Sequence, residues 1–287
     1  MHDSFGGGRV GWRWAASRAQ PERLYRLLGR LRPWTAAQRA WRRLAAIGLD
    51  LPVAAEPTLF PGLAIDAAVR DLREDGFHAG LVLPPDLVAA LCRHAETAPC
   101  RRAPGDPERF RIGDIRDGLS PRGYVVAVAD IDLAACAPAE RIARDRALVM
   151  LVRNHLGYPP RSVVARLYWS PSAALSDDDR RDNGQTIDFH YDIERQPTLY
   201  VFFYLGDTDR GRGAHVVIAG SHRARPLWLA WSATRQPEGV VLARYGRSKV
   251  VVLEGPAGFG FAEDPSCFHK ALPPLSGPRL VLQLRYS

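Results

Sequence analysis

The sequence predicts a mixed α and β protein whose core is a double-stranded β-helix, or jelly roll, with flanking helices and a helical N-terminal extension. One observation is a series of short apolar segments, separated by turns containing Gly and Pro, in the second half of the chain, as in antiparallel double-sheet folds. The other is an arginine-rich segment with helical periodicity that precedes them. We therefore expect a basic helical extension over residues 1–56 and a jelly-roll domain over residues 57–287.

The expected strands are bounded by turn residues. Residues 198–205 are almost wholly aromatic, β-branched or aliphatic, and a second apolar run, 214–219, follows the glycine-rich turn 206–213, so the two runs predict a hairpin. The other expected strands are 163–169, 249–253, 258–261 and 279–286, and a supporting helix is expected at 139–156. The polar segment 170–187 is expected to be a mobile loop that acts as a lid.

Two polar residues alternate just before the first of these runs, in Phe189-His190-Tyr191-Asp192. Alternate side chains of a strand point to the same face, so His190 and Asp192 would point together. His269 is the single His after His222 and would supply a third ligand from a later strand. Two imidazoles and one carboxylate on one side of a metal are the ligand set of non-haem Fe(II) sites with open positions. A two-residue motif alone is weak evidence, and the surrounding strands strengthen it.

From about residue 64 to residue 287 the sequence resembles the phytanoyl-CoA dioxygenase family of Fe(II)/2-oxoglutarate oxygenases, which have a cupin-like fold. The run from His190 to Gly220-Ser221-His222 is similar to the family's ligand strand, hairpin and Gly-Ser-His turn. His269 and Arg279 fall where the family places its distal iron ligand and the arginine that holds the far carboxylate of 2-oxoglutarate. The chain departs from the family in the Pro-rich segment 270–278, which lacks an Asn, and at His215, where an uncharged residue is more usual.

The resemblance implies Fe(II) and 2-oxoglutarate as cofactors, O2 as co-substrate, and succinate and CO2 as co-products. Related halogenases have a small residue in place of the carboxylate, so Asp192 favours hydroxylation. Arg279 offers a planar fork that suits a carboxylate, and Arg285, six residues later on the same strand face, is the alternative anchor. Further contacts to 2-oxoglutarate are expected from four side chains with hydroxyl or amide groups: Tyr168, Thr198, Tyr200 and Gln283.

Each of these residues also has a structural interpretation. A lone His in a strand usually packs or forms a hydrogen bond, as we expect for His215, and Ser221 and His222 more simply stabilise their turn. Arg279 could instead form a surface ion pair. The competing function is a catalytically silent metal-binding jelly roll that acts as a sensor or scaffold. We favour an enzyme that hydroxylates a small organic substrate, which would be anionic, amphiphilic or linked to a carrier, because a silent protein has no chemical need for the whole set.

The positive charge is concentrated at the N-terminus. Residues 1–50 carry ten Arg against three acidic residues, a net charge of +7 out of +8 for the whole chain. We expect a disordered start through about residue 18 and two helices, near residues 24–31 and 35–48, with Trp12, Trp14, Trp34 and Trp41 in the extension. We expect the helices to pack on the barrel, and peripheral contact of residues 1–50 with anionic membranes is the alternative. Without a recognised motif, nucleic acid is not an expected partner.

Cysteine usage and hydropathy predict a cytoplasmic location. The four cysteines are scattered and form no Cys-x-x-Cys pair, which favours reduced thiols over disulfides or a zinc site. The sequence contains no apolar stretch long enough to span a bilayer and no signal-peptide core. Abundant Ala, Arg and Pro with only two Lys suggest a bacterial source.

Overall fold

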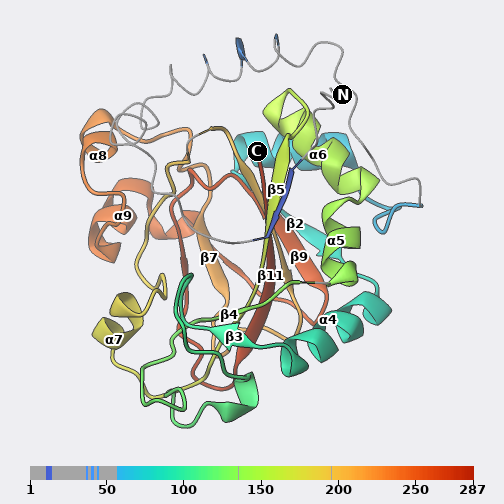
Figure 1. Ribbon diagram of the computed structural model, residues 1–287. Coiled ribbons are helices and arrows are strands. Elements are labelled where there is room, and N and C mark those ends of the chain that lie inside the picture. Colours follow the sequence, from blue (N-terminus) through green and yellow to red (C-terminus); the bar gives the residue numbers. More distant parts are fainter. Residues whose placement is uncertain are drawn as a thin grey trace, which may run out of the picture.

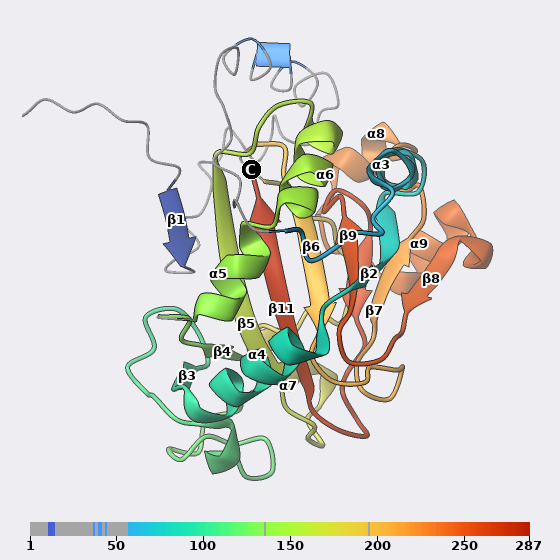
Figure 2. The same ribbon diagram turned by 90° about the vertical axis from the view of Figure 1, so that its right-hand side faces the viewer.

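The computed structural model describes residues 11–14, 37, 40–41, 44, 57–134, 136–194 and 196–287. It shows two β-sheets packed against each other, with helices on both outer sides (Figures 1 and 2). The larger sheet has the order β2-β9-β6-β11-β5-β4-β3, with β1 paired to β5, and the smaller has the order β10-β7-β8. This arrangement confirms the predicted jelly-roll core with flanking helices.

The strands of the larger sheet are β1 (Gly11–Trp14), β2 (Phe77–Val82), β3 (Cys100–Arg101), β4 (Ala129–Ile131), β5 (Ser162–Ser170), β6 (Leu199–Tyr204), β9 (Phe259–Glu263) and β11 (Arg279–Tyr286). Those of the smaller sheet are β7 (His215–Ile218), β8 (Val250–Leu253) and β10 (His269–Ala271). The helices are α3 (Ile65–Glu74), α4 (Pro85–Thr97), α5 (Ala137–Ala143), α6 (Arg146–Leu156), α7 (Asp177–Asp182), α8 (Leu227–Trp231) and α9 (Glu238–Tyr245), with 3-10 turns at Ile112–Asp114 and Arg247–Lys249.

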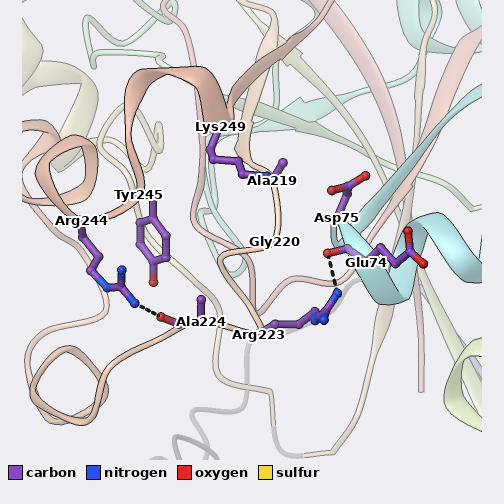
Figure 3. A pocket seen from close by; sticks show the side chains of 9 residues that line it. All are labelled: Glu74, Asp75, Ala219, Gly220, Arg223, Ala224, Arg244, Tyr245 and Lys249. Atoms are coloured by element: carbon purple, nitrogen blue, oxygen red, sulfur yellow. Dashed lines mark hydrogen bonds between the residues drawn. The ribbon is translucent and has the colours of Figure 1, made fainter.

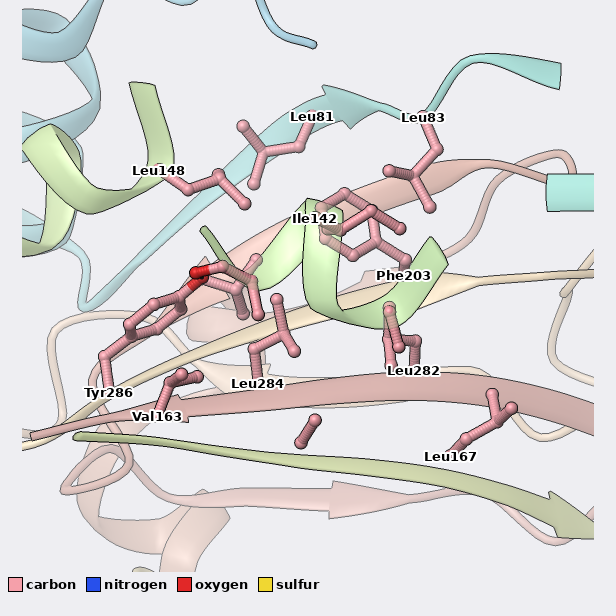
Figure 4. Packing of buried hydrophobic residues seen from close by; sticks show 14 of the residues in the cluster. Leu81, Leu83, Ile142, Leu148, Val163, Leu167, Phe203, Leu282, Leu284 and Tyr286 are labelled. Atoms are coloured by element: carbon pink, nitrogen blue, oxygen red, sulfur yellow. The ribbon is translucent and has the colours of Figure 1, made fainter. Parts of the chain in front are cut away.

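Strand β11 shows how the larger sheet separates its two faces. Its even-numbered residues, Leu280 to Tyr286, are buried in an apolar core with side chains of α3, α4, α5 and α6 (Figure 4). Its odd-numbered residues point to the other face, where Val281 packs with Val217 of β7 and Leu253 of β8. The outward face of the larger sheet therefore forms the main core, and its inward face lines the space between the two sheets.

The smaller sheet is covered on its outer side by α8 and α9, which lie beside β7 (Figure 1). Val216 and Ile218 of β7 pack there with Leu229 of α8 and Val241 of α9. Because β7 contributes Val217 to the opposite cluster, this strand also alternates between an outer core and the interior. The space between the two sheets thus has a sheet on either side, and each sheet is covered by helices on its outer face.

The two apolar runs at 198–205 and 214–219 form strands, but the predicted hairpin is wrong. Strand β6 belongs to the larger sheet, whereas β7 belongs to the smaller. The turn 206–213 therefore crosses from one sheet to the other, and the Tyr204 hydroxyl accepts a hydrogen bond from the backbone N–H of His215 across this crossing, at 2.9 Å. Both arrangements need the same apolar runs and the same glycine-rich turn, so the sequence pattern does not distinguish them.

The helix predicted at 139–156 is divided into α5 and α6. Asp145 stands between them in an extended conformation, and its carboxylate accepts hydrogen bonds from the backbone N–H groups of Ala147 and Leu148. It also accepts from the Thr58 hydroxyl and from the N–H of Leu59. An Asp in this position begins a new helix by satisfying its free N–H groups, which ends the continuous helix that the apolar spacing predicts.

The segment 170–187 is more ordered than predicted. It contains α7, whose first turn is stabilised by a reciprocal capping box between Ser176 and Asp179. Arg180 is 1% exposed and donates hydrogen bonds to the side chain of Gln185 and to the carbonyl of Ala173. The segment is therefore not a loop throughout, because local capping and one buried Arg stabilise a short helix within it. Its mobility and its role as a lid stay predictions.

The N-terminal extension is described only in part. Residues 11–14, which we expected to be disordered, form β1 and pair in parallel with residues 162–165 of β5. Most of the two predicted helices lies outside the described residues. Within the second, Ala37, Ala40, Trp41 and Leu44 are helical, and the side chains of Trp41 and Leu44 are 71% and 65% exposed. No helix in the described part of the chain is long and apolar enough to cross a membrane.

We predict that Asp145→Ala lowers the free energy of unfolding by about 2–4 kcal/mol, because it leaves several buried N–H groups without an acceptor. Urea denaturation measures the change. Ser176→Ala is the matched control, since it removes the cap of an exposed helix and should cost about 1 kcal/mol or less. Equal losses in the two variants would contradict the role given to Asp145.

Candidate metal centre

The structure brings His190, Asp192 and His269 together. Their potential ligand atoms all lie within 4.8 Å of one another, and this is the one such group of His, Cys, Asp or Glu among the described residues. His269 is the first residue of β10 and comes from the smaller sheet. The predicted triad is therefore assembled from two segments that are almost 80 residues apart in the sequence.

The two histidines are paired through their backbones. The N–H of His190 donates to the carbonyl of His269 at 2.9 Å, and the N–H of His269 donates to the carbonyl of His190 at 2.8 Å. The ring centroids are 4.3 Å apart. His190 makes only isolated bridges, so the regular strand predicted for residues 189–192 is wrong. The N–H of Asp192 is held by the carbonyl of Pro265 at 2.8 Å instead.

Both rings are oriented by carbonyl groups of the backbone. The Nδ1 atom of His190 lies 3.0 Å from the carbonyl of Asp188, and that of His269 lies 3.0 Å from the carbonyl of Cys267. A carbonyl only accepts, so each Nδ1 carries the proton and each Nε2 keeps its lone pair for a metal. Burial lowers the pKa of both imidazoles, that of His269 to about 4, so both rings are neutral near pH 7.

The carboxylate of Asp192 completes the set. Its Oδ1 atom lies 3.9 Å from Nε2 of His190, and its Oδ2 atom accepts a hydrogen bond of 3.0 Å from the Tyr200 hydroxyl. Burial alone would raise the pKa of this carboxyl, but the nearby His269 and His190, the Arg285 guanidinium and the hydrogen bond from Tyr200 together hold it below its ordinary value. Two neutral imidazoles and one ionised carboxylate fit a divalent metal with open positions, and the second oxygen is held by a neighbour, as is usual for ligating carboxylates.

Arg279 lies on the same inward face of β11 as Gln283 and Arg285. Its guanidinium donates to the carbonyl of Gly213 and, at 3.3 Å, to the Ser170 hydroxyl. The Arg279 Nε atom and the Gln283 side-chain oxygen are buried and have no hydrogen-bond partner. Buried donors are normally paired, so the free Nε fits a ligand carboxylate at this end of the interior.

The remaining residues predicted to contact 2-oxoglutarate are placed as follows. Tyr168 lies on β5 and packs into the interior cluster, with the Arg166 guanidinium 4.4 Å from its ring centroid. The Thr198 hydroxyl donates to the carbonyl of Gln196. The Tyr200 hydroxyl is directed at Asp192 and Glu194, so the structure gives it a partner that the sequence analysis did not foresee.

Arg285, the alternative anchor, lies beside Tyr200 and Glu194. Its guanidinium is 4.7 Å from the centroid of the Tyr200 ring and 3.9 Å from a carboxylate oxygen of Glu194. Burial opposes its charge, but Tyr200 and Asp192 beside it keep the pKa of Arg285 above its ordinary value. Arg285 therefore lies near Asp192, whereas Arg279 contacts Gly213 and Ser170.

Solved structures share this architecture. EctD from S. alaskensis with bound Fe aligns over 83% of this chain and 82% of its own, with a TM-score of 0.54 and 20% identity. SnoN from nogalamycin biosynthesis, a non-haem α-ketoglutarate-dependent epimerase, aligns over 78% and 82%, with a TM-score of 0.52 and 19% identity. EvdO2 from Micromonospora carbonacea var. aurantiaca, complexed with 2-oxoglutarate, aligns over 78% and 91%, with a TM-score of 0.53 and 16% identity.

The chain shares the fold of these proteins. At identities of 16–20% the likeness extends to the fold and agrees with the predicted jelly roll. No family model matches the chain, and no curated protein does.

Two residues next to the triad were not foreseen as part of the site. Glu263 ends β9 and is fully buried, with a carboxylate oxygen 3.3 Å from Nδ1 of His269. His215 lies 2.8 Å from the other oxygen of Glu263. The sequence does contain a signal for Glu263, which is an acidic residue at the end of the apolar run Phe259-Gly-Phe-Ala-Glu263. An acidic side chain in a buried strand needs a polar partner.

A surface pocket of about 520 Å3 lies elsewhere, between the end of α3, the turn at Gly220 and α9 (Figure 3). Glu74, Arg223, Arg244 and Lys249 are among its lining residues, and no residue predicted to bind metal or 2-oxoglutarate is. The triad lies instead in the interior, where Asp192 contacts Tyr200 of the larger sheet and His269 belongs to the smaller.

We predict that the protein binds one divalent metal ion per chain and that Asp192→Ala weakens this binding by at least about 100-fold, because it removes the single anionic ligand. Isothermal titration calorimetry with Co(II) under anaerobic conditions measures the affinity. Asp71→Ala is the matched control, since Asp71 also pairs with a histidine, His78, at 2.7 Å but lies outside the triad. Weaker binding in the control, or unchanged binding in Asp192→Ala, would place the metal elsewhere.

Proposed function

We propose that the protein is an Fe(II)- and 2-oxoglutarate-dependent dioxygenase that hydroxylates a small organic substrate and releases succinate and CO2. The observation that carries this proposal is the convergence of two neutral imidazoles and one carboxylate within 4.8 Å in a jelly roll that is also lined by a buried arginine. The fold, which is shared with proteins solved with iron or 2-oxoglutarate, supports the same reaction type.

The proposed roles follow from the contacts of each side chain. His190, Asp192 and His269 would hold Fe(II), and the backbone carbonyls behind the two rings keep Nε2 available as the ligand atom. Tyr200 orients Asp192 by donating to its second oxygen. Bound iron and 2-oxoglutarate supply the activation of O2 and the oxidising power, while the protein supplies binding and orientation.

Arg279 is the proposed anchor for the far carboxylate of 2-oxoglutarate. It is 5% exposed, and its unpartnered Nε atom leaves a donor for an incoming carboxylate. A desolvated carboxylate needs such a fixed cation. Arg285 lies beside Tyr200 and near the charge of Asp192, where it would contact an anionic group of the substrate. This arrangement supports the anionic substrate that we favour among the expected classes.

Hydroxylation is the proposed outcome because Asp192 retains the carboxylate of the triad. SnoN is an epimerase, so the fold is compatible with more than one fate of the substrate. EctD was also solved with 2-oxoglutarate and 5-hydroxyectoine, which supports a small molecule as the substrate of this chain. The competing function, a silent metal-binding scaffold, requires no conversion of 2-oxoglutarate.

The decisive experiment is an assay for succinate after Fe(II), 2-oxoglutarate and O2 are added to the purified protein without a substrate. An oxygenase of this type is expected to release some succinate even when turnover is uncoupled from substrate. Asp192→Ala is the matched negative control. If the wild type binds metal but forms no more succinate than this variant, with candidate substrates present as well, the scaffold interpretation is correct.

We predict that Arg279→Leu raises the concentration of 2-oxoglutarate needed for half-maximal succinate formation by about 100-fold, since loss of a buried charge-assisted pair costs about 3 kcal/mol. Arg285→Leu should change this concentration by less than about threefold. Rates measured over a range of 2-oxoglutarate concentrations test both variants. The reverse order would assign the anchoring role to Arg285.

Peripheral membrane contact of residues 1–50 is a second proposal, supported by the net charge of +7 and by the exposure of Trp41 and Leu44. We predict that Trp41→Ser/Leu44→Ser leaves the melting temperature unchanged and lowers binding to vesicles rich in phosphatidylserine, because exposed Trp and Leu on a basic helix insert at the interface. Vesicle co-sedimentation measures the binding, with neutral vesicles as the control. A lower melting temperature would instead favour packing on the barrel.

A further inference from the structure

Glu263 occupies an unusual position for a carboxylate. It is the last residue of β9, its side chain has no exposed surface, and it faces the space between the two sheets. One carboxylate oxygen lies 3.3 Å from Nδ1 of His269, and the other lies 2.8 Å from Nε2 of His215. Glu263 therefore lies behind the ring of His269, next to Nδ1. The Nε2 atom, which would bind the metal, is on the other side of the ring.

His215 is also buried. It lies on β7, and its ring centroid is 5.3 Å from that of Phe202, 5.1 Å from that of Phe261 and 5.4 Å from that of His269. Its Nε2 atom is buried and has no other hydrogen-bond partner, and an imidazole ring can direct an N–H group toward Glu263 from this position.

This pair is a poor way to stabilise the fold. Burying a carboxylate costs several kcal/mol unless it is well hydrogen-bonded, and neither oxygen of Glu263 has an aligned hydrogen-bond donor. Apolar residues would fill the same space, since Phe202 and Phe261 already surround the pair. The location beside a ligand ring indicates a role in the site instead.

We propose that Glu263 is a positioning residue of the metal centre, which holds the ring of His269 from behind and is itself held by His215. The Nδ1–H group of His269 donates to the carbonyl of Cys267 at 3.0 Å, and a carboxylate oxygen of Glu263 lies 3.3 Å from the same nitrogen. A carboxylate behind a ligating imidazole fixes the ring and makes its other nitrogen a stronger ligand. His215 lies against the second oxygen and restricts rotation of the carboxylate.

The proposal rests on the proposed function in one respect, that His269 binds a metal. It adds that the ring of His269 is held differently from the ring of His190. His190 is oriented by a carbonyl alone, whereas His269 has a carbonyl and a buried carboxylate. We therefore expect metal affinity to depend on Glu263, a residue that does not contact the metal.

The test is Co(II) affinity of the full chain, measured by calorimetry without 2-oxoglutarate. Glu263→Gln keeps the shape of the side chain and replaces one carboxyl oxygen with an amide nitrogen. It should weaken binding by about 10- to 100-fold, as for other residues that hold a ligand from behind. Glu108→Gln is the matched control: Glu108 is also buried, but it bonds Ser120 and the backbone of Arg122. A Glu263→Gln affinity within twofold of wild type would overturn the proposal.

A second variant separates positioning from stability. His215→Phe/Glu263→Leu replaces the buried polar pair with apolar side chains, which is often neutral or stabilising. We expect its melting temperature to be equal to or above that of the wild type, while Co(II) affinity falls at least as far as in Glu263→Gln. A lower melting temperature with unchanged Co(II) affinity would show a structural role and overturn the proposal.

The metal-free protein provides a readout that is independent of metal binding. In 15N spectra of the histidine rings, Glu263→Gln should shift the signals of His269 and His215 and leave those of His190 unchanged. If the wild type binds no Co(II), the proposed function fails, and these shifts still decide whether Glu263 holds the ring of His269. Unchanged signals of His269 would overturn the positioning role even in a protein that binds metal.

Discussion

The pairing of His190 with His269 is the constraint on which the site depends. Two reciprocal backbone hydrogen bonds, of 2.9 and 2.8 Å, join the segment before β6 to the first residue of β10. Because these bonds fix the distance between the two backbones, the rings meet without any bond between the side chains themselves. Tyr200 and Pro265 then position Asp192 against this pair. The ligand set is thus assembled by the same kind of interaction that forms the sheets.

The three residues that the structure brings together could be singled out from the sequence because their signals are local. His190 and Asp192 stand just before a long apolar strand, and His269 is the single later His. The connection between β6 and β7 could not be predicted, since a turn within one sheet and a crossing between two sheets use the same residues. The break between α5 and α6 at Asp145 could not be predicted either. The apolar spacing continues across it, and the hydrogen bonds from Thr58 and Leu59 come from residues that are distant in the sequence.

Glu263 and His215 show a different limit of sequence reasoning. Each is a single polar residue in an apolar run, and on its own each is most simply explained by packing or exposure. Only the pairing of β6 with β9, and the packing of β7 beside them, brings the two side chains within 2.8 Å. The main apolar core lies against helices on the outer face of the larger sheet, and another lies on the outer face of the smaller sheet. The interior between the sheets has only a smaller apolar cluster, and it also holds these polar residues.

The alternation along β11 has a consequence for how the sequence of this protein can change. Even-numbered positions from Leu280 to Tyr286 face the helices, and Arg279, Gln283 and Arg285 face the interior. Substitutions on one face can therefore alter chemistry while the other face keeps the fold intact. Insertion or deletion of a single residue would exchange the two faces, moving guanidinium groups into the apolar core and leucines into the site. In evolution this strand should accept replacements far more readily than changes in length.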